Sequence, residues 1–173
     1  MFKGTSASAG IGIGKAVIVE EAELVITRNE VADAEAEIQR FKGALEKTIA
    51  ATQKMADDLA SRVGEKEAEI MQGHMMLLSD PMLTGEIENS VKNDKVNCEF
   101  AIENVCNMYA DMFASMGDEL MQQRATDMRD IKVRMQRTLM GLESVDVSLL
   151  PKGSILVAKD LTPSMTAGIN PEN

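Results

Sequence analysis

The chain has 173 residues and a net charge of −10, from 18 basic and 28 acidic side chains. This charge excludes a basic nucleic-acid-binding protein and gives no polybasic patch for membranes. Aromatic residues make up only 3% of the chain, whereas 14 Met join Leu, Ile, Val and Ala as apolar bulk, which favours helix packing. No stretch reaches the about 18 apolar residues of a membrane span, so no membrane insertion is expected.

The cysteines and the single histidine limit the sites that the chain can form. Cys98 and Cys106 are eight positions apart in a helical pattern, roughly 12 Å along a helix axis, which exceeds the about 7 Å that a disulfide tolerates. We expect both thiols to be reduced and partly buried, as in the cytosol. Because His74 is the only histidine, sites that need two imidazoles are excluded, and no metal site or cofactor is expected in this chain.

Residues 15–20 predict a strand, because they are β-branched and bounded by glycines and acids. Residues 24–26 predict either a second short strand or an extended lead into a helix. The preceding glycines resemble a phosphate-binding loop only superficially. Ala9 and Ala16 stand where that pattern needs Gly and Ser or Thr, and the glycines precede a strand instead of following one.

Five helices are predicted next, over residues 31–63, 66–78, 81–91, 97–116 and 123–140. In the first, apolar or small residues recur at steps of three and four, which is a seam that needs other helices as partners. The seam consists of Ile38, Phe41, Leu45, Thr48, Thr52, Met55 and Leu59.

Glycines and prolines separate these helices and mark the return to another kind of structure. Gly64 ends the first helix, Pro81 suits the first turn of the third, and Gly141 suits a C-terminal cap. A strand is predicted at residues 154–158, followed by a helix with Thr162 as its N-cap. The predicted fold is therefore mainly α: a helical hairpin bundle inserted into an incomplete α/β unit.

An apolar cluster covers the end of the second predicted helix and the start of the third. Seven apolar side chains in thirteen positions exceed what one buried stripe needs: Met71, Met75, Met76, Leu77, Leu78, Met82 and Leu83. One interpretation is a docking site for a basic protein. Its acidic rim would be Glu65, Glu67, Glu69, Asp80 and Glu86. The other interpretation is a helix buried on two sides of a bundle. His74 has no orienting partner nearby in sequence, which is more typical of a structural or surface histidine than of a catalytic one.

Four segments occur in a characteristic order: GTSASAGIGIGKA at 4–16, GHMMLLSD at 73–80, RATDMRDI at 124–131 and LVAKDLTPS at 156–164. Together they resemble the N-terminal part of Enzyme I, the phosphoenolpyruvate–protein phosphotransferase of the bacterial sugar phosphotransferase system. The resemblance covers the whole chain.

The resemblance implies a domain organisation and a partner. In this family a helical subdomain that binds the phosphocarrier protein HPr is inserted into an α/β phosphohistidine subdomain. Applied to this chain, the resemblance places the first part of the α/β subdomain at 1–28 and the helical HPr-binding subdomain at 29–143. A truncated return into the α/β subdomain is then expected at 144–173. Thr166 matches a threonine that hydrogen-bonds the active histidine, and Asp127 lies near that junction. The carrier-docking positions fall on Glu65, His74, Met76, Leu77, Met82, Leu83, Met121 and Arg124.

The resemblance also implies a parent enzyme that passes phosphate from phosphoenolpyruvate through a histidine to HPr. The family uses Mg²⁺ in a C-terminal barrel domain, through which we expect the parent to dimerise. The Gly-Gly-x-Thr-Ser-His signature of the active histidine is absent here, so we expect a cytoplasmic fragment with no catalytic residue of its own.

Two alternatives stay open. The parent could be phosphoenolpyruvate synthase, pyruvate phosphate dikinase or a dihydroxyacetone-kinase phosphotransfer subunit, although the Gly73–Leu78 helix end disfavours the first two. Alternatively, the chain could be a structural helical protein that oligomerises through its Met-rich face.

Overall fold

The computed structural model describes residues 8–19, 23–142 and 147–169, without the side chains of Glu67 and Ser148. All five predicted helices are present with ends shifted by a few residues, and residues 24–26 form no strand. The elements in chain order are β1 (Lys15–Val19), α1 (Ala34–Arg62), α2 (Glu65–Leu78), α3 (Pro81–Asp94), α4 (Cys98–Ser115), α5 (Glu119–Met140), η1 (Val147–Leu149), β2 (Ser154–Ala158) and α6 (Pro163–Gly168).

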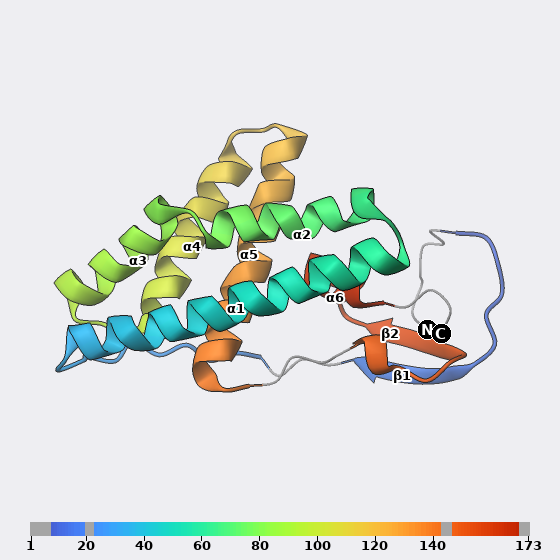
Figure 1. Ribbon diagram of the computed structural model, residues 1–173, viewed down its shortest axis with the longest axis horizontal. Helices are drawn as coiled ribbons and strands as arrows, with labels where there is room; N and C mark the ends of the chain where they lie inside the picture. Colours follow the sequence, from blue (N-terminus) through green and yellow to red (C-terminus); the bar gives the residue numbers. More distant parts are fainter. Residues whose placement is uncertain (1–7, 20–22, 143–146, 170–173) are drawn as a thin grey trace, which may run out of the picture.

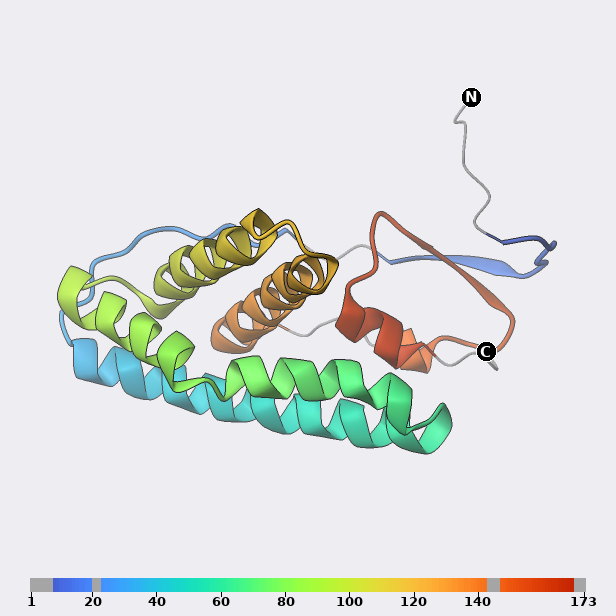
Figure 2. The same ribbon diagram turned by 90° about the horizontal axis from the view of Figure 1, so that it is seen from above.

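The helices form two layers. α1 is a long rod, and α2 and α3 run back along it one after the other (Figure 1). The α4–α5 hairpin packs on one side of this layer (Figure 2). The predicted end signals are confirmed: Asp80 and Pro81 start α3, and Gly141 caps α5 with a left-handed φ of 66°.

The main apolar core lies between α1, α3, α4 and α5. The predicted seam of α1 faces this core and its continuation, with Ile38, Phe41 and Leu59 buried and Leu45 and Met55 partly exposed. A second and much smaller apolar cluster joins α1, α2 and α6. It consists of Ala56, Leu59, Met71 and Ala167.

Outside the bundle, β1 and β2 form a two-stranded parallel sheet in the register Lys15↔Ser154 to Val19↔Ala158. The connection between the strands is the whole helical bundle, which agrees with a bundle inserted between two parts of an α/β unit. A Cβ atom at Gly14 would clash with the Gly153 carbonyl oxygen, so the entry to this sheet requires glycine. The predicted boundary at 143/144, and segments such as Gly4–Ser6 and Glu20, lie outside the described residues.

The two cysteines are free, as predicted, and they are more completely buried than expected. Burial raises the pKa of both thiols to about 12, helped at Cys98 by the nearby Glu37 carboxylate. Both thiols therefore stay protonated and unreactive near neutral pH. Within the described part of the chain, no helix has the length and apolar character needed to cross a membrane.

Candidate functional site

A groove of about 910 Å³ lies where the end of α1, α2, the start of α5 and α6 meet. It brings Arg124 and Asp127 of α5 together with the distant Thr166 of α6, three residues that the resemblance had marked. Its apolar walls come from Leu59, Val63, Ile70, Leu120, Leu161, Pro163, Ala167 and Ile169. We call it the α2–α6 groove.

Behind this groove, His74 joins α2 to α5. Its side chain is 0% exposed, its Nε2 lies 3.2 Å from Asp127 Oδ1, and its Nδ1 lies 3.8 Å from Asp130 Oδ2. The shorter contact has hydrogen-bond length, whereas Nδ1 has no hydrogen-bond partner among the described residues. The sequence offered no orienting partner for His74, because both carboxylates come from α5. The imidazole is fully enclosed in this conformation, and direct contact of His74 with the carrier stays a prediction.

Arg124 shares Asp127 with His74 and lies directly against the backbone of α2. Its Nη1 donates to Asp127 Oδ2 at 3.4 Å, and a Cβ atom added at Gly73 would come within 2.5 Å of the same nitrogen. The glycine next to His74 therefore leaves room for the guanidinium. The Arg124 side chain stays 33% exposed, so it keeps N–H donors that an anionic group in the groove could use.

The short helix α6 is fixed to α5 by Asp130. This buried carboxylate accepts hydrogen bonds from the Ser164 backbone N–H and from Ser164 Oγ, both at 2.8 Å. Thr162 caps the helix as predicted, accepting from the Met165 N–H. Thr166 is exposed on α6, lines the α2–α6 groove and donates to the Thr162 carbonyl oxygen at 2.7 Å. A line of polar contacts thus runs from Arg124 through His74 to the helix that carries Thr166.

The apolar cluster of α2 and α3 contains both exposed and buried side chains. The exposed ones fit the docking site that the sequence suggested, and the buried ones fit a helix packed inside the bundle. Met76 and Met82 are 72% and 69% exposed, and Leu77 is partly exposed. Met71, Leu78 and Leu83 are buried. The Leu83 side chain is 1% exposed and belongs to the core of the bundle in this conformation, and its contact with the carrier stays a prediction.

The remaining predicted docking residues are accessible. Glu65 is exposed at the start of α2, and Met121 is partly exposed in the first turn of α5. The side chain of Glu67, predicted in the acidic rim, lies outside the described residues. Exposed methionines recur every four residues at the end of α4, a spacing visible in the sequence that had not been assigned a role, and Leu120 is exposed at the start of α5. These methionines are Met108, Met112 and Met116.

The described ranges contain no group of three or more His, Cys, Asp or Glu side chains that could hold a metal ion.

Comparison with known proteins identifies the class to which this arrangement belongs. Residues 3–124 match the family described as PEP-utilising enzyme, N-terminal. The chain therefore belongs to this family of phosphoenolpyruvate-utilising enzymes.

Its relatives within the family carry the name phosphoenolpyruvate-protein phosphotransferase. The chain is 38% identical over 171 residues to the protein of that name from Bacillus subtilis and 40% identical over 169 residues to that from Listeria monocytogenes, covering 99% and 98% of this chain. It spans 30% of the length of each of these relatives.

Solved structures agree with this assignment. A solution structure of Enzyme I superimposes with a TM-score of 0.88 at 36% identity, over 99% of this chain and 70% of that one. The N-terminal domain of a nitrogen-related Enzyme I superimposes with a TM-score of 0.70 at 24% identity and supports the fold alone. The resemblance to the N-terminal region of Enzyme I and the mainly α fold are thus confirmed.

Proposed function

We propose that this chain is the carrier-docking part of a phosphoenolpyruvate-protein phosphotransferase, and that it binds HPr over the exposed side of α2 and the starts of α3 and α5. The docking residues of this proposal are the accessible members of the predicted set, which are Glu65, Met76, Leu77, Met82, Met121 and Arg124.

The observation that carries the proposal is an exposed apolar side chain beside a fixed cation. Met76 follows Gly73 by three positions, so it shares the face of α2 over which Arg124 lies. A large exposed methionine costs little in a surface that a partner covers, and its flexible thioether adapts to different contours. The adjacent guanidinium suits a phosphoryl group carried by that partner. The net charge of −10 suits a partner with a basic surface.

Phosphoryl transfer itself is proposed for the whole protein, with another histidine as the phosphate acceptor. His74 is a poor candidate for that role, because it is buried and paired with Asp127. Use of Mg²⁺, dimerisation through a C-terminal domain and a cytoplasmic location remain proposals based on the family.

The test is calorimetric titration with HPr. Met76→Ala and Met82→Ala should each weaken binding by about 1–3 kcal/mol, the scale of one buried aliphatic side chain. Met140→Ala is the matched control, because Met140 is exposed at the opposite end of α5 and should leave the affinity unchanged. Unchanged affinity in the first two variants, with the fold intact, would show that the chosen face is wrong.

Charged residues should act differently from apolar ones. Glu65→Gln should mainly slow association, and the change should shrink at high salt. Arg124→Gln should weaken binding of phosphorylated HPr more than that of unphosphorylated HPr, and equal losses would refute its proposed role.

Self-association through the exposed methionines is the competing function. Sedimentation of the chain without HPr distinguishes the two, since a monomer that binds HPr supports docking. A dimer that Met76→Ala and Met82→Ala dissociate would support oligomerisation instead.

A further inference from the structure

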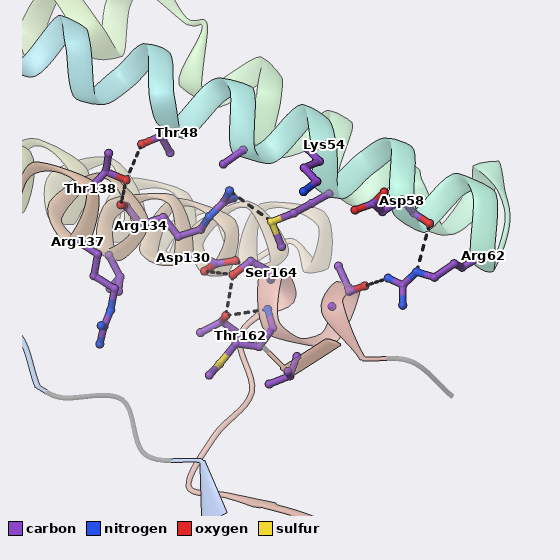
Figure 3. A pocket seen from close by; sticks show the side chains of 17 residues that line it. Thr48, Lys54, Asp58, Arg62, Asp130, Arg134, Arg137, Thr138, Thr162 and Ser164 are labelled. Carbon is purple, nitrogen blue, oxygen red and sulfur yellow. Dashed lines mark hydrogen bonds between the residues drawn. The ribbon is translucent and has the colours of Figure 1, made fainter. Parts of the chain in front are cut away.

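A second cavity lies on the other side of α6 from the α2–α6 groove. It has a volume of about 370 Å³ and is enclosed by α1, α5, η1 and α6 (Figure 3). This volume is at the lower end of the range for small-molecule sites in proteins. Its walls are largely apolar, with side chains that include Ala51, Met55, Val133, Val147 and Met165.

Cationic side chains meet in this cavity, although the chain as a whole is strongly acidic. Figure 3 shows Lys54 reaching in from α1 and Arg134 from α5. Four other charged residues line the cavity, Asp58, Arg62, Asp130 and Arg137, and two of them are engaged by hydrogen bonds within the chain. Arg62 donates to the Ala167 carbonyl oxygen at 3.0 Å, and Asp130 accepts two hydrogen bonds from Ser164. Figure 3 shows the Arg137 guanidinium pointing away from Lys54 and Arg134, so these two are the cations that could receive a ligand.

Arg134 has an unfilled donor. Its Nη2 donates to Thr52 Oγ1 at 2.7 Å, whereas its Nη1 is buried without a hydrogen-bond partner among the described residues. Burial lowers the pKa of Arg134, opposed by the nearby Asp130 carboxylate. A buried guanidinium donor without an acceptor is costly, and an anionic acceptor would recover the most energy.

We propose that this cavity binds a small organic anion that carries one oxyanion group, carboxylate or phosphate, on a short apolar body. The oxyanion accepts from Arg134 Nη1 and lies close to the Lys54 ammonium. The apolar body packs against Met55, Val133 and Met165. This site is separate from the proposed HPr surface and does not depend on it.

The experiment follows the Arg134 side-chain nitrogens and the methionine methyl groups by NMR during titrations at low salt. Hexanoate and phenyl phosphate are the probes, and hexanamide is the neutral control. Hexanoate or phenyl phosphate should shift the Arg134 and Met165 signals and bind at least about tenfold more tightly than hexanamide, which is roughly 1.4 kcal/mol. Whichever anion binds more tightly identifies the oxyanion.

Variants test whether the named cations are responsible. Lys54→Gln should weaken binding of the better anion severalfold, because Lys54 is exposed at the rim and its loss leaves the fold intact. Lys47→Gln makes the same charge change elsewhere on α1, outside the cavity lining, and should have no effect. Arg134→Gln should abolish binding where the variant folds. Equal affinity for hexanamide, equal effects of the two lysine variants, or no binding would overturn the proposal.

Discussion

The end of the bundle where α3 and α4 pack on α1 and α5 is closed by apolar side chains, whereas the end where α2, α5 and α6 meet is closed mainly by polar ones. Among the residues that the structure describes, sixteen buried side chains form the first core and four form the apolar cluster at the second end. Apolar burial stabilises without a strict direction, but hydrogen bonds and ion pairs fix orientation. The first end therefore supplies stability, and the second sets the relative positions of Arg124, His74 and α6.

The largest effect should come from a cavity in the apolar end. Ile102 is fully buried on α4, so Ile102→Ala should lower the free energy of unfolding by about 2–5 kcal/mol. Urea unfolding measures this loss. Met112→Ala, an exposed position on the same helix, should change stability by less than about 0.5 kcal/mol. Similar losses in the two variants would contradict the division into a core and an exposed side of α4.

A smaller and local effect should follow from Asp130→Asn at the polar end. The amide keeps the shape but loses the charge that faces His74 and one of the two acceptor oxygens used by Ser164. We expect a loss of about 1–3 kcal/mol, expressed as faster hydrogen exchange at the amide of Ser164 while buried amides of α4 keep their protection. Asp111→Asn is the control, because Asp111 is exposed and its contact with Arg129 is long, at 3.9 Å. An exposed pair at this distance contributes little to stability. An unchanged Ser164 exchange rate would show that Asp130 does not hold α6.

The smallest change in stability should come from Gly73→Ala. Alanine favours a helix over glycine by about 0.5–1 kcal/mol, but its Cβ must displace the Arg124 guanidinium from Asp127. The two effects should nearly cancel in thermal unfolding, while the Arg124 side-chain NMR signals move. Gly85→Ala on α3 is the matched control, since nothing lies within 4 Å of its Cβ position, and it should stabilise without shifting those signals. A stationary Arg124 in Gly73→Ala would contradict the contact.

The apolar end could be predicted from the sequence far better than the polar end. Steps of three and four predicted the long helix α1, and Gly64, Pro81 and Gly141 marked helix ends, so the five long helices were all predicted. This worked because periodicity and end signals are local properties of the sequence. The helix pattern did not show which of two adjacent apolar side chains is buried. Leu83 and Met82 are neighbours of similar character, but only the structure shows which of them faces the core.

The site was predictable only as a set of residues and not as an arrangement. The resemblance marked Arg124, Asp127 and Thr166, and the structure brings them to one groove. The roles of Asp130 and Gly73 were missed, because each depends on a contact with another helix. The buried state of His74 was missed for the same reason, since its carboxylate partners lie 53 and more positions away.

The pairing of β1 with β2 has a consequence for the order in which the chain folds. Each strand finds its partner across the entire bundle, and the entropy cost of closing a loop rises with its length. The α1–α2 and α4–α5 hairpins involve much shorter loops and should form earlier. Once the hairpins have assembled, the two ends of the bundle hold the strand segments near each other. The remaining entropy cost of pairing the strands is then small. The parallel sheet should therefore be the last element to form in refolding and the first to be lost when the bundle is weakened.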